Sequence, residues 1–270
     1  MSWEVIDRVQ VTRAAVEVAE RVAGMVGRLV DTDIPIPGSD WTVGETAAHL
    51  EYTNIGLGLI ARGLDVPYGD GTLGGIAEAN ADSFEFLTDR DGTVLGPRIL
   101  TAVCVFAAEA VAQPDDRVTN TPMGTMGIDA LASYVLTHNL MHGCAIAAAL
   151  GAASPFRPEH APLMWPFLRV ALERTLDADA AAGLTASIEV TVEGAFSGVL
   201  VFDEGRLTVT ATAGPGTRSV DCHVSIDPET FFLWVVKLVT TPEAIQRGGL
   251  KVWGPRPELG SMLPDLFTVP

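Results

Sequence analysis

The hydrophobic periodicity of this chain changes after Gly151, and this change constrains the fold more than any other feature. Before that residue, apolar side chains recur at the three- and four-residue spacing of amphipathic helices. After it, segments such as 187–193 alternate apolar and polar side chains, as strands with one buried face do. The 270 residues are also about twice the length of a typical domain. The sequence therefore predicts a helical domain over 1–152 and an α+β domain over 158–270, joined by a proline-containing linker.

The first domain is expected to be a four-helix bundle. Thr42 and Glu45 have the spacing of a capping box, so we expect a helix to begin there, and Gly151 is suited to end one. Helical spacing predicts helices over Val5–Leu29, from Thr42 to about Arg62, and over Ile76–Leu87, Val94–Ala112 and Ile128–Leu150. The segment Gln113–Gly127 is expected to be a loop. Four long helices suffice for an up-down bundle.

The second domain is expected to contain an antiparallel sheet with helices. Alternation predicts strands over Ser187–Glu193, Gly198–Phe202, Leu207–Ala211, Cys222–Ile226 and Leu250–Trp253. Helices are expected over Ala161–Ala181, Thr230–Leu238, Pro242–Gln246 and Leu259–Phe267.

The charge balance narrows the classes of partner. The chain carries 17 Lys and Arg against 34 Asp and Glu, a formal net charge of -17. An acidic surface repels phosphate backbones, so we expect no nucleic-acid partner. It also repels anionic small molecules unless a local positive centre attracts them.

Several features predict a soluble cytoplasmic protein with no membrane partner. The first ten residues carry charges where a signal peptide is apolar. The apolar run Ile99–Ala112 is interrupted by Glu109 and is too short to span a bilayer. Cys104, Cys144 and Cys222 are widely spaced and odd in number, which indicates buried thiols in a reducing compartment.

The histidines form the strongest chemical pattern. His138 and His142 are four residues apart on a predicted helix, so both imidazoles share one face and could bind the same metal ion. His49, on another predicted helix, could supply a third ligand and leave a coordination position open. The alternative is three half-buried histidines that form hydrogen bonds within a helical core. His160 and His223 lack partners at matching spacing, and we expect them to be structural.

Two histidine-containing segments resemble a known family. Residues 38–50 are similar to the P-G-W-T-V-x-D/E-L/V-x-A-H-L segment of the mycothiol-dependent maleylpyruvate isomerases, which are DinB-like metal-binding four-helix bundles. Residues 138–151 resemble the second segment of that family, E/H-x-x-x-H-x-x-D-x-x-x-A-x-G. Residues 227–254 resemble the end of the sterol-carrier-like domain that often follows the bundle. The resemblance covers nearly the whole chain and implies the same two domains.

The resemblance implies a metal site, and this chain differs from the family's pattern at two positions near it. His49 matches the first ligand of the family and His142 the last. His138 stands where the isomerases usually carry Glu, which changes the charge of the site by one unit, and Ala145 replaces an Asp of the family. Both departures weaken the case for maleylpyruvate as the substrate and leave the metal site intact. Zinc is the default cation for an open three-histidine site, with nickel, iron or cobalt as alternatives.

The resemblance also implies an activity. In the family a cation activates mycothiol, an actinobacterial thiol, as the metal-bound thiolate nucleophile. This chain would then be a thiol S-transferase or a cis–trans isomerase acting on a small electrophile. Arg247, with Arg218 as the second choice, is the candidate for holding an anionic substrate, and Tyr134 for proton transfer beside His138. The alternatives are a solvated helix end for Arg247 and core packing for Tyr134.

Two other function classes remain open. The first is a non-catalytic metal- or lipid-binding protein that uses an apolar groove of the C-terminal domain. The second is a regulatory partner protein of the stress-response type built on such a bundle.

Overall fold

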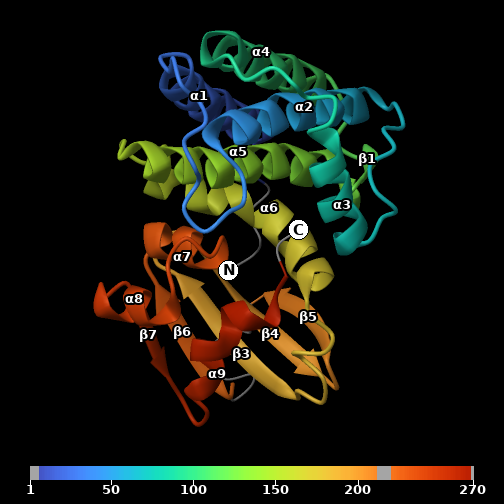
Figure 1. Ribbon diagram of the computed structural model, residues 1–270. Helices are drawn as coiled ribbons and strands as arrows, with labels where there is room; N and C mark the ends of the chain where they lie inside the picture. The colour runs from blue at the N-terminus through green and yellow to red at the C-terminus, as the bar shows by residue number, and fades with distance from the viewer. Residues whose placement is uncertain (1–5, 212–219, 269–270) are drawn as a thin grey trace. The chain divides into compact units, whose positions relative to one another are not determined.

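The computed structural model describes residues 6–211 and 220–268 (Figure 1). Contacts within the chain divide it into two compact units, Ile6–Arg157 and a second unit that starts at Pro158. The fold class predicted from the sequence is confirmed, because a helical N-terminal region precedes a sheet with helices.

The first unit is built on four long helices. Within it α1 and α2 each contact both α4 and α5, and α4 also contacts α5, so the four form a bundle. The long helices are α1 (Arg8–Val26), α2 (Val43–Arg62), α4 (Gly92–Val111) and α5 (Ile128–Leu150). A shorter helix α3 (Leu73–Ser83) and a hairpin of β1 (Val118–Thr121) and β2 (Gly124–Gly127) complete the unit.

The helix ends follow from local chemistry. Thr42 and Glu45 form the predicted capping box at the start of α2, in which the Thr42 hydroxyl accepts from the Glu45 amide and the Glu45 carboxylate accepts from the Thr42 amide. Gly151 ends α5 with φ 60°, a conformation that costs glycine little. The prediction that Gln113–Gly127 is a loop was wrong in part, because the segment contains the β1–β2 hairpin. Its strands are short and rich in Thr, Asn and Gly, so they lack the apolar alternation that identifies a strand.

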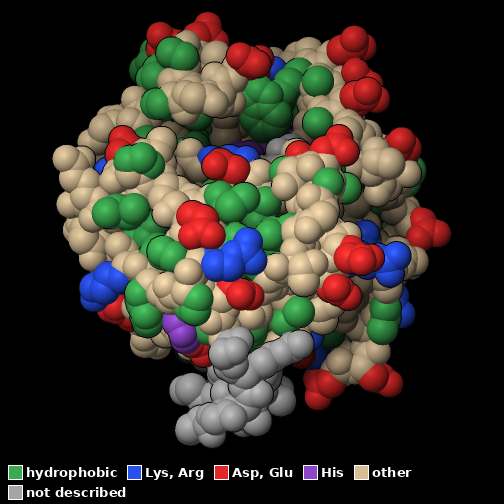
Figure 2. Space-filling view, turned by 90° about the horizontal axis from the view of Figure 1, so that it is seen from below, with side chains coloured by type: hydrophobic (Ala, Val, Ile, Leu, Met, Phe, Trp, Pro, Cys, Tyr) green, Lys and Arg blue, Asp and Glu red, His purple; other side chains and the backbone are tan. Residues whose placement is uncertain are grey.

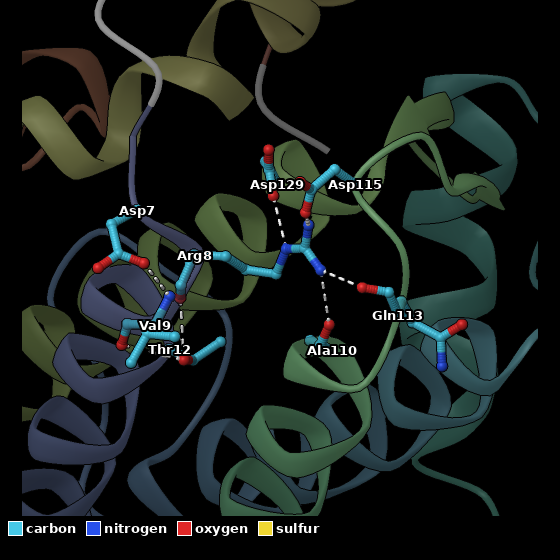
Figure 3. Close-up of polar contacts among 8 residues, drawn as sticks. All are labelled: Asp7, Arg8, Val9, Thr12, Ala110, Gln113, Asp115 and Asp129. Atoms are coloured by element: carbon cyan, nitrogen blue, oxygen red, sulfur yellow. Dashed lines mark hydrogen bonds and ion pairs between the residues drawn. The ribbon is translucent and has the colours of Figure 1, made fainter.

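Arg8 joins three elements at one end of the bundle (Figure 3). Its Nε donates to Asp129 at the start of α5 at 2.6 Å, and one terminal nitrogen donates to Asp115 at 2.6 Å. The other terminal nitrogen donates to the carbonyl oxygen of Ala110 in the last turn of α4 and to that of Gln113 just after the helix. The Arg8 side chain is only 9% exposed. These acceptors offset the free-energy cost of burying its charge.

The apolar helix α4 packs into the bundle along one face, and 39% of its most apolar 18-residue stretch is buried. By length and composition alone it could cross a membrane. It contacts α1, α2 and α5, and Ile99, Val103 and Phe106 are fully buried. Acidic side chains are spread among polar and apolar ones on the face of the molecule in Figure 2, as the net charge leads one to expect.

The second unit contains a mixed five-stranded sheet of order β5-β4-β3-β6-β7. Its strands are β3 (Ala186–Val192), β4 (Phe196–Asp203), β5 (Arg206–Ala211), β6 (Cys222–Ile226) and β7 (Leu250–Trp253). Its helices are α6 (Ala161–Thr175), α7 (Pro228–Val235), α8 (Thr241–Gln246) and α9 (Glu258–Met262), with short 3-10 turns η1 (Pro158–His160) and η2 (Leu263–Leu266).

Two expectations about this unit were wrong. The sheet is not wholly antiparallel, because β3 and β6 pair in parallel, with Val190 opposite Val224. Alternation shows which face of a strand is buried but not which strand pairs with it or in which direction. Helix α6 ends at Thr175 rather than Ala181, because the segment that follows bridges to the chain end through Leu176 and Phe267.

Candidate metal centre

Two helices of the bundle bring three histidines together. His49 lies on α2, and His138 and His142 lie one turn apart on α5. One ring nitrogen of each lies within 4.8 Å of the corresponding atoms of the other two. The Nε2 atoms of His49 and His138 are 3.1 Å apart. Two nitrogens bound to one tetrahedral cation at about 2.0–2.1 Å would lie roughly 3.3 Å apart, so this spacing suits a shared ion.

Burial keeps these imidazoles neutral. The side chains of His49 and His138 are 3% and 7% exposed, and His142 is half-buried. Burial lowers the pKa of all three histidines, and the charge of His142 lowers the pKa of His49 and His138 further. The pKa of His142 falls to about 4. At neutral pH each ring therefore offers a lone pair, which is the state that a cation requires.

The polar atoms of the triad fit a cation better than a hydrogen-bonded core. A His49–His138 hydrogen bond would use a proton on one Nε2 and a lone pair on the other, but it would leave His142 outside. The Nδ1 atoms of His49 and His138 are buried and have no hydrogen-bond partner among the described residues. A divalent cation would use one nitrogen from each of the three rings at once. The donor set of three neutral imidazoles is one that zinc accepts.

Trp41 covers part of the triad. Its ring lies 5.0 Å from that of His49 and stacks on His142, with 5.9 Å between centroids and 12° between planes. Phe84 packs edge-on against the indole at 5.0 Å. The backbone of Trp41 is fixed because its carbonyl accepts from Ile36 and its neighbour Thr42 caps α2. Sequence reasoning did not identify this indole, although Trp41 lies in the segment that resembles the isomerases.

The predicted proton-transfer residue Tyr134 lies against the triad. Its ring meets that of His138 edge-on, with 5.8 Å between centroids. Burial raises the pKa of Tyr134 above the usual range, and the nearby Tyr68 raises it further. Burial also raises the pKa of Tyr68 to about 12, and the Tyr68 hydroxyl donates to the side-chain oxygen of Asn80. Tyr134 is therefore a neutral phenol at physiological pH, whose hydroxyl can donate a hydrogen bond.

A pair of buried amides that the sequence analysis missed lies on the two helices that carry the histidines. Asn54 on α2 and Asn139 on α5 are both fully buried and exchange two hydrogen bonds. The signal was present, because an Asn within an apolar helix has to find a partner when it is buried.

The other candidate residues belong to the second unit of the chain. Arg247 is exposed at the C-cap of α8 in the second unit, so its role in holding a substrate stays a prediction. Arg218 lies outside the described residues. His160 is buried. The Nδ1 atom of His223 forms a hydrogen bond with the Glu189 carboxylate at 2.7 Å.

The thiols differ in part from expectation. Cys144 and Cys222 are buried, but Cys104 is exposed on α4. None of these three thiols is part of a disulfide in the described residues. The prediction of buried thiols was wrong for Cys104, because its position falls on the side of α4 that no other helix of the bundle covers.

Comparison with known families identifies part of the second unit. Residues 168–260, about a third of the chain, match the SCP-2 sterol transfer family. The sheet unit therefore contains a sterol-carrier-like domain. No curated protein sequence matches the chain.

Comparison with solved structures extends over both units. The crystal structure of the mycothiol-dependent maleylpyruvate isomerase aligns with 84% of this chain and 86% of its own, at 17% identity and a TM-score of 0.51. A mutant of the isomerase aligns equally well. At this identity the likeness shows a shared fold. The sec-alkylsulfatase Pisa1 from Pseudomonas sp. matches at 19% identity and a TM-score of 0.31 over 52% of this chain, and the match spans only 24% of the sulfatase.

Proposed function

We propose that this chain is a metal-dependent enzyme that uses a low-molecular-weight thiol, with mycothiol as the first candidate. The observation that carries the proposal is the convergence of His49, His138 and His142 within 4.8 Å. The isomerase that shares the fold is mycothiol-dependent, which favours the same cosubstrate here. We propose zinc as the cation, with nickel, iron or cobalt as alternatives.

Different residues have different roles at the proposed site. The three histidines would hold the cation through neutral nitrogens, so its full charge is retained. A cation held there would lower the pKa of a bound thiol and so favour the thiolate near neutral pH. Trp41 excludes water from one side of the imidazoles, and Tyr134 holds a proton beside His138. A positive centre also offsets the repulsion that the net charge of -17 imposes on acidic substrates.

Two reactions on a small electrophile follow from one first step. Addition of the thiolate to an activated double bond, rotation and elimination give a cis–trans isomerase. Displacement of a leaving group, or addition without elimination, gives an S-transferase. In either case Arg247 is proposed to hold an anionic substrate. The three free cysteines suit a reducing cytoplasm, which we propose as the location.

Metal analysis and a thiol screen test this proposal. We expect about one divalent cation per chain, lost in His138→Ala/His142→Ala and retained in the control His223→Ala. Metal-loaded protein is then offered electrophiles with mycothiol, glutathione or cysteine, and we expect turnover with mycothiol. Tyr134→Phe should retain the metal and lower turnover about 100-fold, since it keeps the ring contact and removes the proton. A wild-type protein that binds no cation, or metal-loaded protein inactive with every thiol, would contradict the proposal.

A groove in the second unit favours a second candidate function, carriage of an apolar ligand. The groove has a volume of about 530 Å³ and is lined by apolar side chains that include Trp234, Val239 and Ile245, together with Lys237, Asp265 and three hydroxyl side chains. The match to a sterol transfer family supports this candidate. Native mass spectrometry should then detect a bound lipid that Ile245→Asp displaces and that His138→Ala/His142→Ala leaves in place.

A further inference from the structure

A pair of buried amides joins the two helices that carry the histidines. The side-chain nitrogen of Asn54 donates to the oxygen of Asn139 at 3.1 Å, and that of Asn139 donates back at 2.8 Å. Asn139 also donates to the carbonyl of Val135 in its own helix at 2.8 Å. Both side chains are 0% exposed. The two amides thus form a closed ring of hydrogen bonds in the interior of the bundle.

Such a pair fixes how two helices align. A buried amide without its partner costs free energy, because water cannot replace the missing hydrogen bonds. The reciprocal bonds form only when Asn54 faces Asn139, so a slide of α2 along α5 breaks both. A single buried Asn sets register in coiled coils by the same principle.

The apolar side chains between α2 and α5 specify the register of the two helices only weakly. Several buried side chains of α2 and α5 are small and similar, including Ala47, Ala48 and Ala147. Small side chains interlock little, so neighbouring registers would bury comparable apolar area. The three imidazoles are neutral and do not attract one another strongly when no cation is bound. The amide pair is a polar contact between α2 and α5 that a change of register would break, and each of its two amides depends on the other.

The pair is close to the ligands in sequence, on the same two helices. Asn139 directly follows His138, and Asn54 lies five residues after His49 on α2. We propose that Asn54 and Asn139 are positioning residues that set the register of α2 against α5 and so assemble the three ligand nitrogens before the cation binds. This inference rests on the proposed metal site.

The double variant Asn54→Leu/Asn139→Leu separates this role from a purely structural one. Replacing a satisfied buried polar pair with apolar side chains of similar volume often leaves stability unchanged or raises it. We therefore expect an unchanged or higher urea midpoint, together with cobalt(II) affinity at least tenfold weaker than in the wild type. The visible cobalt(II) spectrum should also lose tetrahedral intensity. Val103→Ala, a fully buried change on α4, is the control that lowers stability without moving a ligand.

Two results would overturn the inference. One is wild-type cobalt(II) affinity in the double variant, and the other is an equal loss of affinity in Val103→Ala. If the wild type itself binds no cation, the proposed function fails, but the register can still be measured. Spin labels at Ile55→Cys and Ala148→Cys, in a Cys104→Ser background, report the distance between α2 and α5. We expect the double variant to broaden that distribution or shift it by about 5 Å, one helical turn, and an unchanged distribution would refute the register role.

Discussion

At the scale of single residues, burial sets both the charge and the proton affinity of the metal-binding imidazoles. His49, His138 and His142 lose hydration when the bundle forms, so the folded protein favours their neutral forms. In the unfolded chain each would titrate near 6.5. The same burial that exposes lone pairs to a cation therefore makes the metal-free protein sensitive to acid.

This difference predicts how stability depends on pH. A histidine whose folded pKa is depressed stabilises the fold fully above its unfolded pKa, and that stability is lost as pH falls toward the folded pKa. For His142 the window runs from 6.5 down to about 4. We expect the metal-free protein to lose up to about 2 kcal/mol from this residue between pH 7 and pH 5. Urea unfolding in chelator at both pH values measures the loss.

His142→Gln is the matched variant for that measurement. It keeps a polar side chain of similar size but does not titrate, so its stability should fall less between pH 7 and pH 5. His223→Gln, in the sheet unit, serves as the control. Equal pH slopes for His142→Gln and the wild type would show that burial of His142 does not govern the acid response.

At the scale of elements, close backbone approach sets how α1 packs on α4. A Cβ at Gly96 would lie 2.7 Å from the carbonyl oxygen of Ala23 and 3.0 Å from the amide nitrogen of Gly27. Both atoms belong to the backbone, so the helices would have to separate. We expect Gly96→Ala to lower the free energy of unfolding by about 1–3 kcal/mol. In contrast, a Cβ at Gly24 meets nothing within 4 Å, and Gly24→Ala should raise stability by about 0.5–1 kcal/mol.

The contacts of Arg8 also allow a prediction about how α1 is held against the ends of α4 and α5. Arg8→Ala removes the shared donor of two carbonyls and two carboxylates, and the carbonyl of Ala110 lies in buried surroundings. We expect a loss of roughly 1–3 kcal/mol in the free energy of unfolding. The carboxylates reach solvent, which limits the effect. Arg13→Ala, an exposed change on the same helix, should shift the urea midpoint little, and equal effects of the two variants would contradict this account.

The same scale shows what sequence can predict. The segment 128–150 was predicted with its observed bounds, because helical periodicity and the Gly151 cap are local signals. The β3–β6 pairing and the β1–β2 hairpin depend on which strands pair, and the local sequence pattern of one strand does not determine its partner. The histidine triad was predicted from spacing on two helices. The stacking of Trp41 and the Asn54–Asn139 pair depend on how α2 faces α5, and spacing within one helix does not determine that.

At the scale of the whole molecule, the three histidines lie in one compact unit and the SCP-2 match in the other. A cation bound to the triad would therefore stabilise the first unit by mass action, because all three proposed ligands lie in that unit. The two units need not unfold as one, so a single melting temperature would mix two responses.

Hydrogen exchange resolves these responses by segment. With zinc in excess, amides in α2 and α5 should exchange at least tenfold more slowly, because opening either helix releases the cation. Amides in β3 and β4 should exchange at unchanged rates. His49→Ala should abolish the protection while leaving exchange in the strands as it was. Equal zinc protection in the strands would mean that the units open together, and no protection of α2 and α5 would mean that the triad does not hold the ion.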